Sequence, residues 1–195
     1  HLEITQYRIV NDHKVEIKAS APIVVYRESI KGRGGPFEGK SPNKHNKFYI
    51  MVEPLEEAVI EAIKNGEIKT EGKIKDPKAL AKQLSDLGMD KEQAKGVVAF
   101  KNNNVFIDVT KGIQNLHETI ELCKQAFEEA MEMGPLAGER VSGVKVLLVD
   151  AKLHEDSIHR GPGQVIPATR SGIYGAMCMA GRVLLEPIQK VYINC

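Results

Sequence analysis

Hydrophobic positions in the second half of the chain repeat with the spacing of two long helices. One apolar stripe predicts a helix that ends near Gly134-Pro135, and a second predicts a helix from Gln164 to Arg182 with Pro167 in its first turn. The first stripe consists of Ile113, Leu116, Ile120, Cys123, Phe127 and Ala130, and the second of Val165, Thr169, Ile173, Ala176 and Ala180. Both stripes indicate helices packed on a core.

Shorter apolar runs predict strands. The expected strands are Val15–Lys18, Ile23–Glu28, Lys47–Val52, a hairpin of Val97–Phe100 with Val105–Val109, and Val144–Lys152. Because strands and helices do not alternate regularly, the pattern favours an α+β sandwich, a mostly antiparallel sheet with helices on one face.

Capping signals predict three more helices. One runs from about Pro54 to Lys64 and ends at Asn65-Gly66, and one starts at Asp76-Pro77 and continues through Leu84. Asp90 is expected to cap the third.

Both ends of the chain lie inside alternating patterns, Leu2–Thr5 and Ile188–Ile193, which suggests strands and a piece of a longer protein. At 42% hydrophobic and 27% charged residues, the composition is typical of a globular protein. The apolar runs are too short to span a bilayer, so we expect a cytoplasmic protein without a membrane partner. Three widely spaced cysteines, Cys123, Cys178 and Cys195, are expected to be buried, unreactive thiols.

The net charge of +1 hides a basic segment, residues 26–47, with six Lys or Arg against two Glu. Such a run is usually a solvated face, but it can also attract RNA phosphates. Within it, residues 34–41 (GGPFEGKS) match the phosphate-binding loop pattern of nucleotide-binding proteins. That loop must open a helix, whereas Pro42 and a polar stretch follow here. We therefore expect no nucleotide site.

Residues 154–159 (HEDSIH) resemble a zinc-binding pattern, but their two histidines are five residues apart. On a helix this spacing turns the side chains about 140° from each other, so we expect no metal site. No catalytic triad can be assembled either, and no catalytic residue is predicted. The loop from His159 to Gln164 has glycines at a helix entrance beside Arg160, which suits an anion. A tight strand-to-helix turn would explain the glycines alone, but two histidines and an arginine on a loop favour a functional role.

At these residues the chain resembles a known family. Residues 41–46 (SPNKHN), 108–112 (DVTKG) and 154–167 (HEDSIHRGPGQVIP) are similar to translation elongation factor 2 of archaea and eukaryotes, and the similarity extends over essentially the whole chain. Pro162, where eukaryotic members have glycine, favours an archaeal version. The resemblance implies the end of domain III at 1–17, a domain IV with the fold of ribosomal protein S5 domain 2 at 18–183, and the first strand of domain V at 184–195.

The resemblance also implies a function. Domain IV would enter the decoding site of the small ribosomal subunit and stabilise tRNA and mRNA during translocation, in contact with rRNA. His159 would be the histidine that the diphthamide biosynthesis enzymes modify and that diphtheria-type toxins ADP-ribosylate. The implied RNA-binding tip consists of Asn43, Lys44, His45, Asn46, His154, Asp156, Arg160, Gly161 and Gln164, with Lys40 and Lys47 nearby.

GTP and magnesium would bind elsewhere in the parent factor, so this portion needs no cofactor and is no enzyme by itself. The alternative is a scaffold domain of a related ribosome-assembly or splicing GTPase. The intact His159-Arg160 and Asn43–Asn46 segments argue against that alternative, because such relatives need no diphthamide site.

Overall fold

The centre of the protein is a five-stranded sheet. The computed structural model describes residues 1–18, 24–70, 72 and 74–188. The strand order is β2 (Gly34–Lys40), β3 (Lys47–Pro54), β6 (Val144–Lys152), β5 (Asn104–Asp108) and β4 (Val97–Lys101). Strands β5 and β6 are parallel, whereas the other neighbouring pairs are antiparallel. The predicted α+β class and the mostly antiparallel sheet are confirmed.

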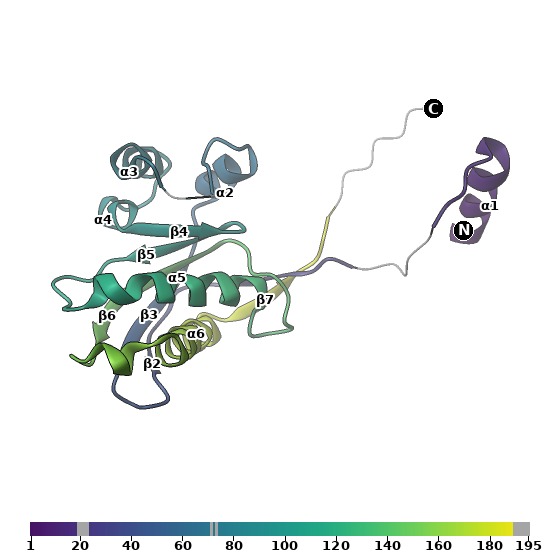
Figure 1. The fold of residues 1–195 in the computed structure, drawn as a ribbon. Helices are drawn as coiled ribbons and strands as arrows, with labels where there is room; N and C mark the ends of the chain where they lie inside the picture. Colours follow the sequence, from purple (N-terminus) through teal and green to yellow (C-terminus); the bar gives the residue numbers. More distant parts are fainter. Residues whose placement is uncertain (19–23, 71, 73, 189–195) are drawn as a thin grey trace.

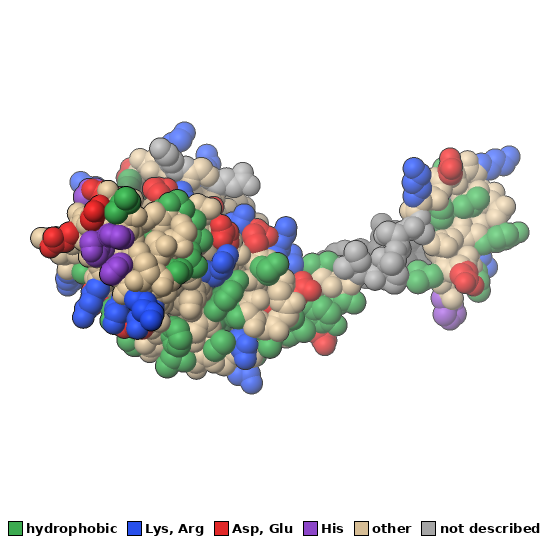
Figure 2. All heavy atoms as spheres, turned by 60° about the horizontal axis from the view of Figure 1, so that its bottom comes forward, with side chains coloured by type: hydrophobic (Ala, Val, Ile, Leu, Met, Phe, Trp, Pro, Cys, Tyr) green, Lys and Arg blue, Asp and Glu red, His purple; other side chains and the backbone are tan. Residues whose placement is uncertain are grey.

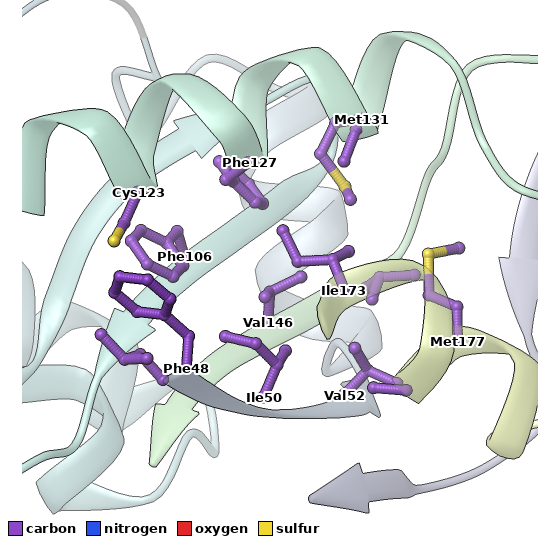
Figure 3. Close-up of a cluster of buried hydrophobic side chains, with 14 of the residues drawn as sticks. Phe48, Ile50, Val52, Phe106, Cys123, Phe127, Met131, Val146, Ile173 and Met177 are labelled. Carbon is purple, nitrogen blue, oxygen red and sulfur yellow. The ribbon is translucent and has the colours of Figure 1, made fainter. Parts of the chain in front are cut away.

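Two long helices, α5 (Leu116–Glu132) and α6 (Pro162–Met179), cover one face of this sheet (Figure 1). The rings of Phe106 and Phe127 stack with centroids 5.5 Å apart between β5 and α5. Each large side chain buried here contributes about 1.5–3 kcal/mol. Figure 3 shows the core that results, with Phe48, Ile50, Val52, Phe106 and Val146 from the sheet and Cys123, Phe127, Met131, Ile173 and Met177 from the helices.

Three short helices, α2 (Glu57–Lys64), α3 (Pro77–Asp86) and α4 (Lys91–Lys95), cover the opposite face (Figure 1). Side chains alternate along β5, so that Phe106 packs with the long helices while Val105 and Ile107 pack with the short ones. The expectation of helices on one face therefore holds for the long helices only. A second core lies beneath the short ones.

The predicted caps of the short helices are confirmed. The Asp76 carboxylate accepts hydrogen bonds from two backbone N–H groups at the start of α3, and Asp90 does the same at α4. Helix α2 ends at Lys64 with Asn65 as its C-cap, and Gly66 follows with a φ of 76°. It starts at Glu57, three residues later than expected.

The N-terminal predictions were wrong. Leu2–His13 forms helix α1, which has no buried residue, and residues 14–18 have no regular structure. The strand expected at Ile23–Glu28 is β1 (Arg27–Ile30), which pairs with β7 (Arg182–Leu185) in a separate two-stranded sheet. Most of the alternating pattern at 188–193 lies outside the described residues.

The last helix also differs from its prediction. Helix α6 begins at Pro162 and ends at Met179, so Arg182 belongs to β7. Pro167 lies inside the helix rather than in its first turn. Pro162 instead occupies the first helical position, where proline fits without loss of a hydrogen bond.

The glycine-rich segment 34–40 is strand β2, which packs closely on α6. A Cβ on Gly39 would lie 2.0 Å from the Ala168 carbonyl oxygen, and one on Gly34 would lie 2.2 Å from that of Ala176. The glycines thus allow a strand to approach a helix backbone. After Ser41 the chain turns into β3 instead of opening a helix, so the geometry of a phosphate-binding loop is not present there. Among the described residues, no helix is both long and apolar enough to cross a bilayer.

Candidate functional site

Two loops far apart in the sequence are joined by hydrogen bonds at one end of the sheet. They are the β2–β3 loop, residues 41–46, and the segment between β6 and α6, residues 153–161. We call these two segments together with Gln164 the tip. The Asn43 side-chain Nδ2 donates to the His159 carbonyl at 3.1 Å, and the Asn43 backbone N–H donates to Gln164 Oε1 at 2.9 Å. The prediction that both loops lie at the same end is confirmed.

Asn46 holds the two loops together from inside. Its side chain is fully buried, Nδ2 donates to the His159 carbonyl at 2.8 Å, and Oδ1 accepts from the His154 backbone N–H at 3.0 Å. Its backbone N–H donates to Ser41 Oγ at 2.9 Å. Because both polar groups of the Asn46 side chain bond within the protein, the exposed position expected for Asn46 is not found. Asn46 is a structural link between the loops.

Three histidine rings lie against one another on the tip. The ring centroids of His154 and His159 are 4.5 Å apart, and the His45 ring is 5.1 Å from His154 and 5.2 Å from His159. His45 is exposed, whereas His154 and His159 are only partly exposed. Figure 2 shows these histidine side chains gathered at the left of the view, above a group of basic side chains.

The sequence argument that kept the two later histidines apart assumed a helix, and it was wrong. Residues 153–156 are not helical, and a short 3₁₀ helix, η1, begins only at Ser157. The loop therefore brings His154 and His159 together. Within the part of the chain that the structure describes, no group of three or more His, Cys, Asp or Glu has the geometry to hold a metal ion.

Asp156 and Gly161 shape the loop. The Asp156 backbone N–H donates to His154 Nδ1 at 3.0 Å, which places the proton of the neutral ring on Nε2. The Asp156 carboxylate accepts a hydrogen bond from the Ile158 N–H and caps η1. Gly161 is the N-cap residue of α6 with a φ of −67°, an ordinary conformation.

Arg160 is not the surface cation that the sequence suggested. Its side chain is only 4% exposed, and Nη2 forms an ion pair with Glu118 Oε2 at 2.8 Å. Glu118 lies in the first turn of α5, 42 residues earlier in the chain. In this arrangement the charge of Arg160 is balanced inside the protein.

Lys44 is the exposed cation of the β2–β3 loop. It sits at the corner of the turn with a φ of 63°, a left-handed conformation, and its N–H donates to the Ser41 carbonyl at 2.8 Å. A non-glycine residue adopts this conformation at some cost in backbone strain. No ion pair within 4.0 Å is recorded for Lys44 among the described residues.

The neighbouring lysines share one carboxylate. Lys47 Nζ lies 3.0 Å and Lys40 Nζ 3.4 Å from Glu38, to which the Tyr49 hydroxyl also donates. The Lys47 hydrogen bond, followed by that of Tyr49, lowers the Glu38 pKa to about 2, and the same contact raises the pKa of Lys47. The two lysines and Glu38 together carry a net charge of about +1.

Sequence reasoning missed Ser41, Glu38 and Glu118 as parts of this site. Ser41 belongs to the segment 41–46, but its buried hydroxyl accepts a hydrogen bond from the Asn46 N–H that forms only in the folded turn. No local pattern marks Glu118. The cysteine prediction was also partly wrong, because Cys123 is buried and burial raises its pKa to about 12, whereas Cys178 is exposed. Cys195 lies outside the described residues.

Comparisons with known proteins agree on one family. The profile described as "Elongation factor G, domain IV" matches residues 66–181. The chain is 62% identical over 194 residues to elongation factor 2 of Thermoplasma acidophilum, 60% over 194 residues to that of Thermoplasma volcanium, and 57% over 195 residues to that of Methanosarcina barkeri. In each case the whole chain is covered, but it spans only 26% of the relative's length. With more than half of its residues matched by that profile, the chain belongs to the elongation factor G domain IV family and corresponds to the domain IV region of elongation factor 2.

Proposed function

We propose that the tip of this domain enters the decoding site of the small ribosomal subunit and stabilises tRNA and mRNA during translocation. The observation that carries the proposal is the joining of the β2–β3 loop to the His154–Gly161 loop in one polar end. There Lys44 is exposed beside three histidine rings. A cation on a projecting turn can contact a phosphate, and imidazole rings can stack on bases or donate to them.

The same proposal assigns His159 as the residue that the diphthamide biosynthesis enzymes modify and that ADP-ribosylating toxins then recognise. Two observations support it. The His159 ring remains partly exposed, while its carbonyl is held by Asn43 and Asn46. Its backbone is thus anchored while part of the residue remains accessible to an enzyme. Mass spectrometry of the peptide that contains His159, from chain produced in an archaeal host, should show the added mass, and an unmodified peptide would contradict this assignment.

The surrounding regions are assigned in the same way. Residues 1–17 would close domain III, residues 18–183 would form domain IV, and residues 184–195 would begin domain V. GTP, magnesium and the catalytic residues for GTP hydrolysis would belong to the remaining three quarters of the factor. Ribosome, tRNA and mRNA are therefore the partners proposed for this portion, in the cytoplasm.

The test uses a full-length elongation factor 2 that carries this chain as its domain IV. Ribosome affinity is measured at several salt concentrations for Lys44→Ala and for Lys82→Ala, an exposed lysine on α3 that serves as the matched control. Loss of one phosphate contact should lower the slope of log K against log salt by roughly 1 for Lys44→Ala alone. Translocation should slow while GTP hydrolysis continues. Equal slopes for Lys44→Ala and the parent factor would refute the proposed contact.

A further inference from the structure

The ion pair between Glu118 and Arg160 connects the tip to the central helix α5. Arg160 is the last residue of η1, directly after His159, and Glu118 lies in the first turn of α5. Figure 1 shows η1 and the start of α5 at the same end of the main body. Arg160 Nη2 also approaches the Glu155 carbonyl at 3.4 Å, so the guanidinium contacts both the helix and the beginning of its own loop.

The burial of this pair is unequal. The Arg160 side chain is 4% exposed, and its Nε and Nη1 atoms are buried without a hydrogen-bond partner among the described residues, whereas the Glu118 side chain is 48% exposed. A buried guanidinium with two unsatisfied nitrogens depends strongly on its remaining partner. Glu118 is therefore the group that keeps Arg160, and with it the end of η1, in place.

The His159 residue is held from two sides. Asn43 and Asn46 donate to its carbonyl from the β2–β3 loop. The next side chain, that of Arg160, is tied to α5 by Glu118. The orientation of the His159 ring against His154 and His45 follows from both restraints, since a rotation of η1 would move the ring and the guanidinium together.

We propose that Glu118 is a positioning residue, which acts through Arg160 to fix the orientation of the His159 ring on the tip. We call the Glu118–Arg160 ion pair the latch, and in this proposal Arg160 belongs to the latch and does not contact phosphate. The inference rests on the proposed function only in so far as the tip is taken as the working end. Neither residue is assigned a contact with RNA.

The first experiment measures the ring positions directly in the 195-residue chain. Imidazole nitrogen and carbon NMR signals of His154 and His159 are compared in the parent chain, in Glu118→Gln and in Glu121→Gln. Glu121 is the matched control, because it is also on α5, is 78% exposed and lies 3.8 Å from Lys124. The His159 signals should shift and broaden in Glu118→Gln and stay unchanged in Glu121→Gln. Unchanged His159 signals in Glu118→Gln would overturn the proposal.

A second variant guards against simple unfolding. In Glu118→Gln with Arg160→Met, the buried charge is removed together with its partner, so the fold should recover much of the stability lost in Glu118→Gln. The His159 signals should nevertheless remain shifted, because the latch is absent. Recovery of the parent signals in this double variant would show that Glu118 affects only stability, and the positioning role would be refuted.

The ribosome assay separates this inference from the proposed function. In the full-length factor, Glu118→Gln and Arg160→Met should each weaken binding by about tenfold, and the double variant should be no weaker than either single variant. The salt slope should stay unchanged in all three. A slope lowered by about 1 in Arg160→Met alone would identify Arg160 as a phosphate contact and overturn the latch. An unchanged slope in Lys44→Ala would instead refute the phosphate contact on which the proposed function relies and leave the NMR result standing.

Discussion

Replacement of Asn46 by alanine should loosen the tip from inside. The change removes the hydrogen bonds to the His159 carbonyl (2.8 Å) and from the His154 N–H (3.0 Å) at a fully buried side chain. Two bonds are worth about 1 kcal/mol each, and a donor left without a partner adds about 1–2 kcal/mol. The expected loss is about 3–4 kcal/mol in the free energy of unfolding, or about 6–16 °C in melting temperature for a domain of this size.

Urea unfolding followed by circular dichroism measures this loss, with Asn43→Ala as the comparison. Asn43 donates to the same carbonyl at 3.1 Å, but it is partly exposed, so water can replace its bonds and the loss should be about 1 kcal/mol. The amide signal of His154 should also move in Asn46→Ala. If Asn46→Ala costs less than about 1 kcal/mol, or no more than Asn43→Ala, the assignment of Asn46 as the structural link is refuted.

Acid should weaken the pairing of β2 with β3. The Glu38 pKa is lowered from 4.5 to about 2 by its lysine hydrogen bond, so its stabilising effect is complete above pH 4.5 and disappears as the pH falls toward 2. Urea midpoints between pH 2 and 7 should show this dependence in the parent chain and less of it in Glu38→Gln; parallel profiles would contradict it. Gly39→Ala would place a Cβ 2.0 Å from the Ala168 carbonyl oxygen of α6 and should lower the free energy of unfolding by about 1–3 kcal/mol. Gly163→Ala has open space around its new Cβ, so thermal unfolding should show a neutral or stabilising change. In a Cys195→Ser variant, a thiol reagent should modify Cys178 in the native protein and Cys123 only after unfolding, because burial raises the Cys123 pKa to about 12. Equal rates of modification at the two thiols would contradict the burial of Cys123.

Local signals in the sequence predicted much of the fold. The Asp76 and Asp90 caps, the β4–β5 hairpin and strand β6 each depend on neighbouring residues, and all were found where expected. The pattern misled at Leu2–Thr5, because four alternating residues fit a short strand and an exposed amphipathic helix equally well. Helix α1 buries no residue, so no apolar stripe with the helical repeat is needed in its sequence.

The tip shows where sequence reasoning ends. The segments that form it were identified, but the direction of each side chain was not. Asn46 and Arg160 are polar residues in loops, which normally favours exposure, yet partners distant in the sequence bury both of them. The partner of Arg160 is 42 residues away on a helix whose only clear pattern was its apolar stripe. Contacts of this kind depend on tertiary packing and leave no local signature.

The arrangement of charge on the tip has a consequence for how it can act. The charge of Arg160 is balanced by Glu118, and Lys40 and Lys47 share the carboxylate of Glu38. Lys44 is exposed in the β2–β3 loop and has no ion pair among the described residues. One phosphate contact contributes a salt slope of only about 1, so charge alone would bind the tip weakly to RNA. In the proposed contact, most of the effect would then come from the shape of the tip and from the histidine rings, which lie beside the buried Asn46 and Arg160 and the half-exposed Glu118. Under the proposed function, a domain that enters the decoding site and leaves it in every cycle would be served better by a well-positioned, weakly charged tip than by a strongly cationic one, because tight phosphate binding would slow its release.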